Sequence, residues 1–129
     1  MKTDKWSITL YLALAFFSIP HLIDDFLFGI PEEFGISNRT AQILAGIFIL
    51  MFLMIFMELV RGTRRGYFFS IFMGTFLALA GILKHIPLMI IPGPYWSGWF
   101  SEALIIGMII SGLVLSLLAG LALRSGPEG

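Results

Sequence analysis

The sequence contains no cysteine, and charged residues are scarce. Only 12% of its 129 residues are charged, and the formal net charge is zero. Ordinary soluble domains carry about 25% charged residues. Without cysteine the chain cannot form a disulfide, a thiolate metal site or a thiol nucleophile. The balanced charge gives no basic excess that would attract nucleic acid, so we expect no nucleic-acid partner.

Common catalytic signatures are also missing. The sequence has no Gly-x-Ser-x-Gly elbow, no Ser-x-x-Lys pair and no glycine-rich phosphate loop. We therefore expect a non-enzymatic function in preference to an enzymatic one.

Apolar residues are abundant. They make up 58% of the chain, and the mean hydropathy is +0.96. A soluble domain of this size could not bury so much apolar surface. Four apolar runs, at about residues 6–25, 41–60, 67–86 and 101–123, each approach the ~20 residues that a membrane-spanning helix needs. The sequence thus predicts an all-α, polytopic integral membrane four-helix bundle, with residues 1–129 as a single transmembrane domain in the lipid bilayer.

The basic residues predict the orientation of this bundle. If the N-terminus is inside, the inner side carries Lys2, Lys5, Arg61, Arg64, Arg65 and Arg124, and the outer side carries Arg39 and Lys84. Basic residues are enriched in cytoplasmic loops. We therefore expect both termini to be cytoplasmic and the protein to lie in the plasma (inner) membrane. The first run lacks a small-x-small cleavage pattern at its end, so we expect a retained helix.

Small residues follow one face of each of the last two runs. They are Ser70, Gly74, Ala78 and Gly81 in the third run, and Ala103, Gly107, Ser111, Gly112, Ser116 and Gly120 in the fourth. Such stripes let helix backbones approach closely in lipid. They predict tight contacts, either inside one bundle or between subunits, and we expect a homo-oligomer or a subunit of a membrane complex. The second run has few small residues and should be the most exposed to lipid.

Two local patterns predict where helices begin and end. The third helix should stop near Pro87, because the residue before a proline is disfavoured in helical geometry. Thr40 and Ser101 are suitable N-caps for the second and fourth helices.

The segment SIPHLIDD, at residues 18–25, ends the first run with polar residues. A spacing of three and four residues places Ser7, Tyr11, Leu14, Ser18, His21 and Asp25 on one helical face. This face should point into the bundle. Asp24 lies about 100° away around the helix, so we expect it to point elsewhere.

Further polar residues should reach the same outer level. Lys84 and His85 end the third run, Glu102 opens the fourth, and Trp96 and Trp99 lie in a proline-rich segment that can act as a lid. The predicted ligand-binding residues are therefore Ser18, His21, Asp25, Lys84, His85, Trp96, Trp99 and Glu102.

Four interpretations of this cluster remain open. The first is ion pairing of Asp25 or Glu102 with Lys84 at the membrane interface, with the histidines hydrogen-bonded in the headgroup zone. The second is a pocket for a small or lipid-like ligand. The third is a metal site of His21, Asp25, His85 and Glu102, whose nitrogen and oxygen atoms suit zinc, iron or manganese. The fourth is a haem between the two histidines.

The function that the sequence favours is binding, or also transport, of a small amphiphilic ligand at an outward-facing polar site. A metal- or haem-dependent membrane enzyme or redox protein is one alternative. A structural subunit of a larger membrane complex is the other.

Overall fold

The computed structural model describes residues 4–93 and 95–125, and in these ranges every regular element is a helix. Four long helices are α1 (Lys5–Leu27), α3 (Asn38–Val60), α4 (Arg64–Ala80) and α6 (Trp99–Arg124). Three short elements join them: α2 (Ile30–Glu33), the π-helix η1 (Gly81–His85) and α5 (Ile86–Ile90). Lys2, which contributes to the predicted orientation, lies outside the described residues.

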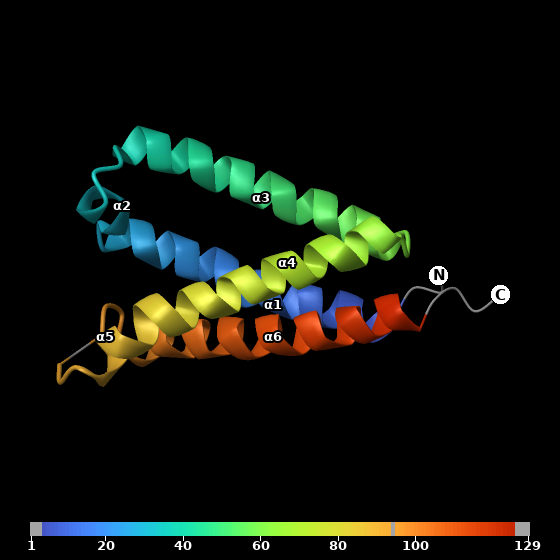
Figure 1. The fold of residues 1–129 in the computed structure, drawn as a ribbon. Coiled ribbons are helices and arrows are strands. Elements are labelled where there is room, and N and C mark those ends of the chain that lie inside the picture. The colour runs from blue at the N-terminus through green and yellow to red at the C-terminus, as the bar shows by residue number, and fades with distance from the viewer. Residues whose placement is uncertain (1–3, 94, 126–129) are drawn as a thin grey trace.

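Four segments are long and apolar enough to cross a membrane. They are Lys5–Leu27, Asn38–Val60, Arg64–Ile90 and Trp99–Arg124. Large apolar side chains cover much of the outer surface of the bundle, as expected for a protein whose solvent is lipid. The predicted four-helix transmembrane architecture is confirmed. Helix α1 begins and α6 ends at the same end of the bundle (Figure 1).

Helix α6 packs along both α4 and α1, whereas α3 contacts α1 and α4 less closely. Gly74 of α4 and Gly112 of α6 mark the tightest approach: a Cβ built on Gly74 would lie 2.6 Å from the carbonyl oxygen of Gly112. The small-residue stripes therefore meet inside one chain. Helix α3 has the smallest buried share of the four spans, at 17%, which confirms that it is the most exposed to lipid.

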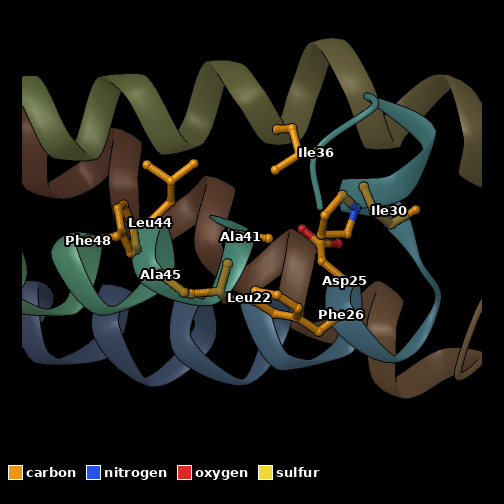
Figure 2. A pocket seen from close by; sticks show the side chains of 10 residues that line it. Leu22, Asp25, Phe26, Ile30, Ile36, Ala41, Leu44, Ala45 and Phe48 are labelled. Carbon is orange, nitrogen blue, oxygen red and sulfur yellow. The ribbon is translucent and has the colours of Figure 1, made fainter. Parts of the chain in front are cut away.

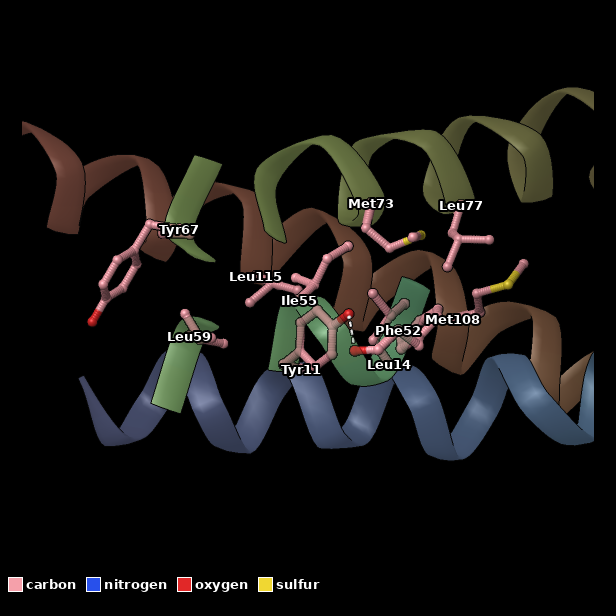
Figure 3. Packing of buried hydrophobic residues seen from close by; sticks show 11 residues of the cluster. Tyr11, Leu14, Phe52, Ile55, Leu59, Tyr67, Met73, Leu77, Met108 and Leu115 are labelled. Carbon is pink, nitrogen blue, oxygen red and sulfur yellow. Dashed lines mark hydrogen bonds between the residues drawn. The ribbon is translucent and has the colours of Figure 1, made fainter. Parts of the chain in front are cut away.

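The buried core lies along the middle of the bundle. Its centre is formed by Tyr11, Leu14, Phe52 and Leu115, which belong to α1, α3 and α6. The Tyr11 hydroxyl donates a hydrogen bond of 3.0 Å to the Phe52 carbonyl (Figure 3). Because lipid offers no hydrogen-bond partner to a buried hydroxyl, this bond also fixes α3 against α1.

The sequence predicted that the third helix would stop near Pro87. The structure differs, because the span continues to Ile90. Proline lacks an N–H and its ring clashes with the carbonyl four residues earlier. The π-helical turn just before Pro87 relieves this conflict, because it widens the backbone, with the Ile86 N–H bonded to the Gly81 carbonyl. Pro87 then falls in the first turn of α5, where proline is tolerated.

The predicted N-caps are also wrong by three residues. Ser37 caps α3 by accepting from the Thr40 N–H, and α6 begins after Gly98 without a side-chain cap. Ser101 instead lies inside the first turn of α6, where its hydroxyl has a different partner, described below.

Candidate functional site

The two histidines of the chain are in direct contact at the end of the bundle where α1 and η1 meet. Their Nε2 atoms lie 3.3 Å apart, and both side chains are buried. His21 comes from the polar face of α1, and His85 is the last residue of the π-helical turn. The π-helix therefore positions one of the two imidazoles, in keeping with the frequent occurrence of such turns at functional sites.

Aromatic residues of the loop before α6 hold both imidazoles. The Tyr95 hydroxyl lies 2.6 Å from His85 Nδ1. Trp96 stacks on the His21 ring at 6.1 Å between centroids and meets the His85 ring edge-on at 5.3 Å. The backbone of Trp96 has a φ of 32°, the only positive φ of a non-glycine residue within the described ranges. Such strain is tolerated where surrounding contacts fix the residue.

Tyr95 lies outside the membrane spans, and its side chain is buried. Burial, followed by the negative charges of Asp25, Asp24 and Glu102, raises the pKa of Tyr95 above its ordinary value. The phenol is therefore neutral at physiological pH and keeps its proton. It can either donate to His85 Nδ1 or accept from it, so the direction of this hydrogen bond is coupled to the tautomer of that ring.

Asp25 adds a carboxylate to the histidine pair. Its Oδ1 lies 3.8 Å from His21 Nε2. This Oδ1 and His21 Nδ1 are buried and have no hydrogen-bond partner among the described protein groups. Buried polar atoms without partners are rare in native proteins and call for an explanation.

Two adjoining cavities meet at Asp25. One, of about 230 Å³, is lined by Ser18, His21, Asp25, Lys84, His85 and apolar neighbours. The other, of about 290 Å³, lies between α1, α2 and α3 and is almost entirely apolar. Figure 2 shows the Asp25 carboxylate at one end of this second lining, with hydrocarbon side chains elsewhere. Leu22, Asp25 and Phe48 line both cavities.

Asp24 points to a different side of α1 from Asp25, as predicted, but that side also faces protein. It is 3% exposed, and its carboxylate accepts a hydrogen bond of 2.6 Å from Ser97 Oγ and another from Ser101 Oγ. The prediction assumed a single buried face, but α1 has α6 on one side and α3 on the other. Asp24 and Asp25 therefore both face protein, on different sides of the same helix.

The remaining predicted residues are divided between the site and the surface. Ser18 and Lys84 line the polar cavity, and the Lys84 ammonium lies 4.3 Å from the centre of the Phe34 ring. Trp99 is 79% exposed and contacts Phe100, so it lies outside the cluster. Glu102 is half-buried but is not part of the group of converging metal-ligand atoms.

The predicted ion pairs with Lys84 do not form in the described part of the chain, whereas the histidines do make polar contacts, with each other and with Tyr95. Among the described residues, no carboxylate lies within 4.0 Å of the Lys84 ammonium, and Glu102 makes no ion pair. The charged groups are instead arranged around a cavity.

The sequence analysis missed four residues that build this site: Asp24, Tyr95, Ser97 and Ser101. Tyr95 carries a hydroxyl beside Trp96 in a loop rich in proline and glycine, and Ser97 and Ser101 are four residues apart on either side of the point where α6 begins. These were the available signals. They could be interpreted only with the knowledge that this loop folds back over the end of α1.

The fold and the site define a helical membrane protein with a polar cluster at one end of the bundle. No family model, curated protein or solved structure matches the chain.

Proposed function

We propose that this membrane protein binds a small amphiphilic ligand at the end of the bundle that holds the histidines. The polar head of the ligand would occupy the cavity beside His21, Asp25, Lys84 and His85. Its apolar part would lie in the adjoining cavity between α1, α2 and α3. The observation that carries the proposal is that the polar and the apolar cavity share three lining residues, Asp25 among them.

The size and chemistry of the two cavities support this assignment. Ligand pockets are mostly apolar, with a few convergent polar groups, and measure about 300–1,000 Å³. Each cavity alone falls just short of that range, and the two adjoin. Lys84 and Asp25 offer opposite charges to a polar head, and neither is taken up by an ion pair with the other.

Transport across the bundle has less support than binding. The polar groups at middle depth already have partners inside the protein. Tyr11 donates to the Phe52 carbonyl, and Ser18 and Ser111 donate to the carbonyls of Leu14 and Gly107, each one helical turn back. We therefore propose a binding site at one end of the bundle and no continuous polar path through it.

The membrane orientation and the oligomeric state remain proposals. The distribution of basic residues supports cytoplasmic termini in a plasma (inner) membrane, which would turn the histidine cluster outward. The small-residue stripes do not support an oligomer, because the stripe of α4 packs against the stripe of α6 within one chain. A homo-oligomer or a complex partner would have to use the exposed apolar faces instead.

Fluorescence quenching tests ligand binding. In a Trp6→Phe, Trp99→Phe protein, Trp96 is the single tryptophan and lies beside His21. The probe is a single-chain amphiphile brominated near its headgroup. We expect quenching that saturates near one amphiphile per chain. Ala45→Phe, which fills the apolar cavity, should weaken binding about tenfold, from an overpacking cost of ~1–3 kcal/mol.

The matched control is Ala103→Phe, which adds the same ring at an exposed position of α6. It should leave the quenching curve unchanged. Quenching that rises linearly with the bulk amphiphile concentration, equally in all variants, would contradict the proposal.

A further inference from the structure

The donor atoms of His21, Asp25 and His85 converge on one point. Each residue offers a ligand atom, and these atoms all lie within 4.8 Å of one another. His21 and Asp25 are one helical turn apart on α1, and His85 comes from η1. We infer that these three residues form a binding site for one divalent first-row transition-metal ion, of the zinc or ferrous iron class.

Two of the three donor separations are close to those around such an ion. Metal–nitrogen bonds of ~2.0–2.1 Å in tetrahedral geometry place neighbouring ligand atoms ~3.3 Å apart. The Nε2 atoms of His21 and His85 are 3.3 Å apart, and His21 Nε2 and Asp25 Oδ1 are 3.8 Å apart. Two imidazoles and one carboxylate form a donor set typical of zinc and non-haem iron sites.

The surroundings of the donors support the same assignment. Asp25 Oδ1 is buried and has no hydrogen-bond donor among the described residues, so a cation would compensate its charge. Metal-binding histidines usually bond their second ring nitrogen to a further group that fixes the tautomer. The Tyr95 hydroxyl, 2.6 Å from His85 Nδ1, is in that position. The Trp96 ring fixes both imidazole planes.

Two earlier interpretations fit less well, namely a haem between the histidines and a metal site that includes Glu102. A haem bound by both histidines would need ~4 Å between the ligating nitrogens and a flat macrocycle between the rings. The observed 3.3 Å contact leaves no such gap. Glu102 lies outside the converging group, so a fourth ligand would have to come from the polar cavity, which all three residues line. Three protein ligands with one position open to a pocket are typical of catalytic rather than structural sites.

The metal site adjoins the proposed amphiphile site but does not depend on it. If the ion binds, its open position would face the polar head of a ligand in the cavity. Ala45→Phe separates the two proposals, because it fills the apolar cavity and leaves every metal donor in place. In this variant, weakened amphiphile binding with unchanged metal binding would support both proposals. In the wild type, stoichiometric metal binding without saturable amphiphile binding would contradict the proposed function alone, and the reverse would contradict the metal site alone.

Metal titration of the full chain tests the inference. The protein is purified in detergent through a tag that contains no histidine, stripped with EDTA and titrated with Co²⁺ and Zn²⁺. We expect one ion per chain and visible Co²⁺ absorption bands of a nitrogen- and oxygen-ligated tetrahedral site. Asp25→Asn and His85→Gln should weaken Zn²⁺ binding more than ~100-fold, because losing an outer-shell partner alone costs ~10–100-fold.

Two further variants make the test specific. Tyr95→Phe keeps all three donors and should weaken Zn²⁺ binding by about 10–100-fold. Glu102→Gln removes a carboxylate at the same end of the bundle but outside the donor group, and it should leave the affinity unchanged. Circular dichroism would verify that each variant is folded. If His85→Gln does not fold, the comparison of Asp25→Asn with Glu102→Gln still decides the question.

Two results would overturn the inference. The first is a folded wild-type chain that binds less than stoichiometric Co²⁺ and Zn²⁺. The second is equal Zn²⁺ affinity in the wild type and Asp25→Asn, which would assign the binding to dispersed surface groups.

Discussion

His21 and His85 are 64 residues apart in the sequence, yet their Nε2 atoms lie 3.3 Å from each other. The contact joins the first and third spans at the end of the bundle that holds both cavities. Each imidazole makes this contact in a buried setting, where the loss of a polar partner is costly. The histidine pair should therefore stabilise the folded protein even when no metal is bound.

A double-mutant cycle should detect this pairing in the metal-free protein. His21→Leu and His85→Leu should each lower the free energy of unfolding by ~1–3 kcal/mol, because each leaves a buried partner unpaired. The double variant should lose less than the sum, by ~0.5–1.5 kcal/mol. Unfolding in mixed micelles, after treatment with EDTA, measures the cycle. Strictly additive losses would show that the two rings are not coupled.

Asp24 should hold the loop of Tyr95 and Trp96 in place. Its carboxylate accepts hydrogen bonds from Ser97 and Ser101, and hydrogen bonds to a charged group contribute ~1.5–3 kcal/mol. Ser97 and Ser101 donate to different oxygens of Asp24, so Asp24→Asn places an NH2 donor against one of the two donating hydroxyls. We expect a loss of ~1–2 kcal/mol and faster proteolysis between residues 91 and 98.

The neighbouring position provides the control for that change. Asp25→Asn alters the same chemical group one residue along, but its carboxylate holds no loop hydroxyl. It should leave the rate of proteolysis of the loop unchanged. Equal acceleration in both variants would mean that Asp24 has no special role in fixing the loop.

The contact of α4 with α6 should be sensitive to a single methyl group. In Gly74→Ala the new Cβ would lie 2.6 Å from the Gly112 carbonyl oxygen, a backbone atom that cannot move aside alone. Overpacking of this kind costs ~1–3 kcal/mol. Thermal unfolding in detergent should show the loss.

Gly46 of α3 offers the matched substitution, because a Cβ there meets no atom within 4 Å. Gly46→Ala should be neutral or stabilise the protein by up to ~1 kcal/mol through higher helix propensity. A Gly74→Ala protein as stable as Gly46→Ala would disprove the close internal contact and reopen the assignment of the stripes to a subunit interface.

The absence of cysteine makes the orientation directly measurable. Glu33→Cys and Arg64→Cys introduce single thiols at exposed positions on opposite ends of the bundle. With cytoplasmic termini, a membrane-impermeant maleimide added to intact cells should label Glu33→Cys and leave Arg64→Cys unlabelled until the cells are opened. The reverse pattern would place the histidine cluster on the cytoplasmic side.

Part of the site could be predicted from the sequence. His21 and His85 had to reach the same end of the bundle, because the first and third spans run in the same direction. The face that contains Tyr11, Ser18 and His21 is buried, as helical spacing indicated. Trp99 was misplaced, because it is the first residue of α6 and lies before the apolar run whose periodicity indicates a buried face.

The sequence by itself indicated that the protein is surrounded by lipid, that it has four spans, and which polar groups lie near the ends of those spans. These follow from composition and from the local periodicity of a helix, which need no knowledge of its neighbours. Only the tertiary structure decided that both Asp24 and Asp25 face protein, that His85 lies in a π-helical turn just before Pro87, and that Tyr95 contacts the histidine pair. Each of these depends on which helix lies beside which, and that arrangement is set by packing between residues far apart in the chain.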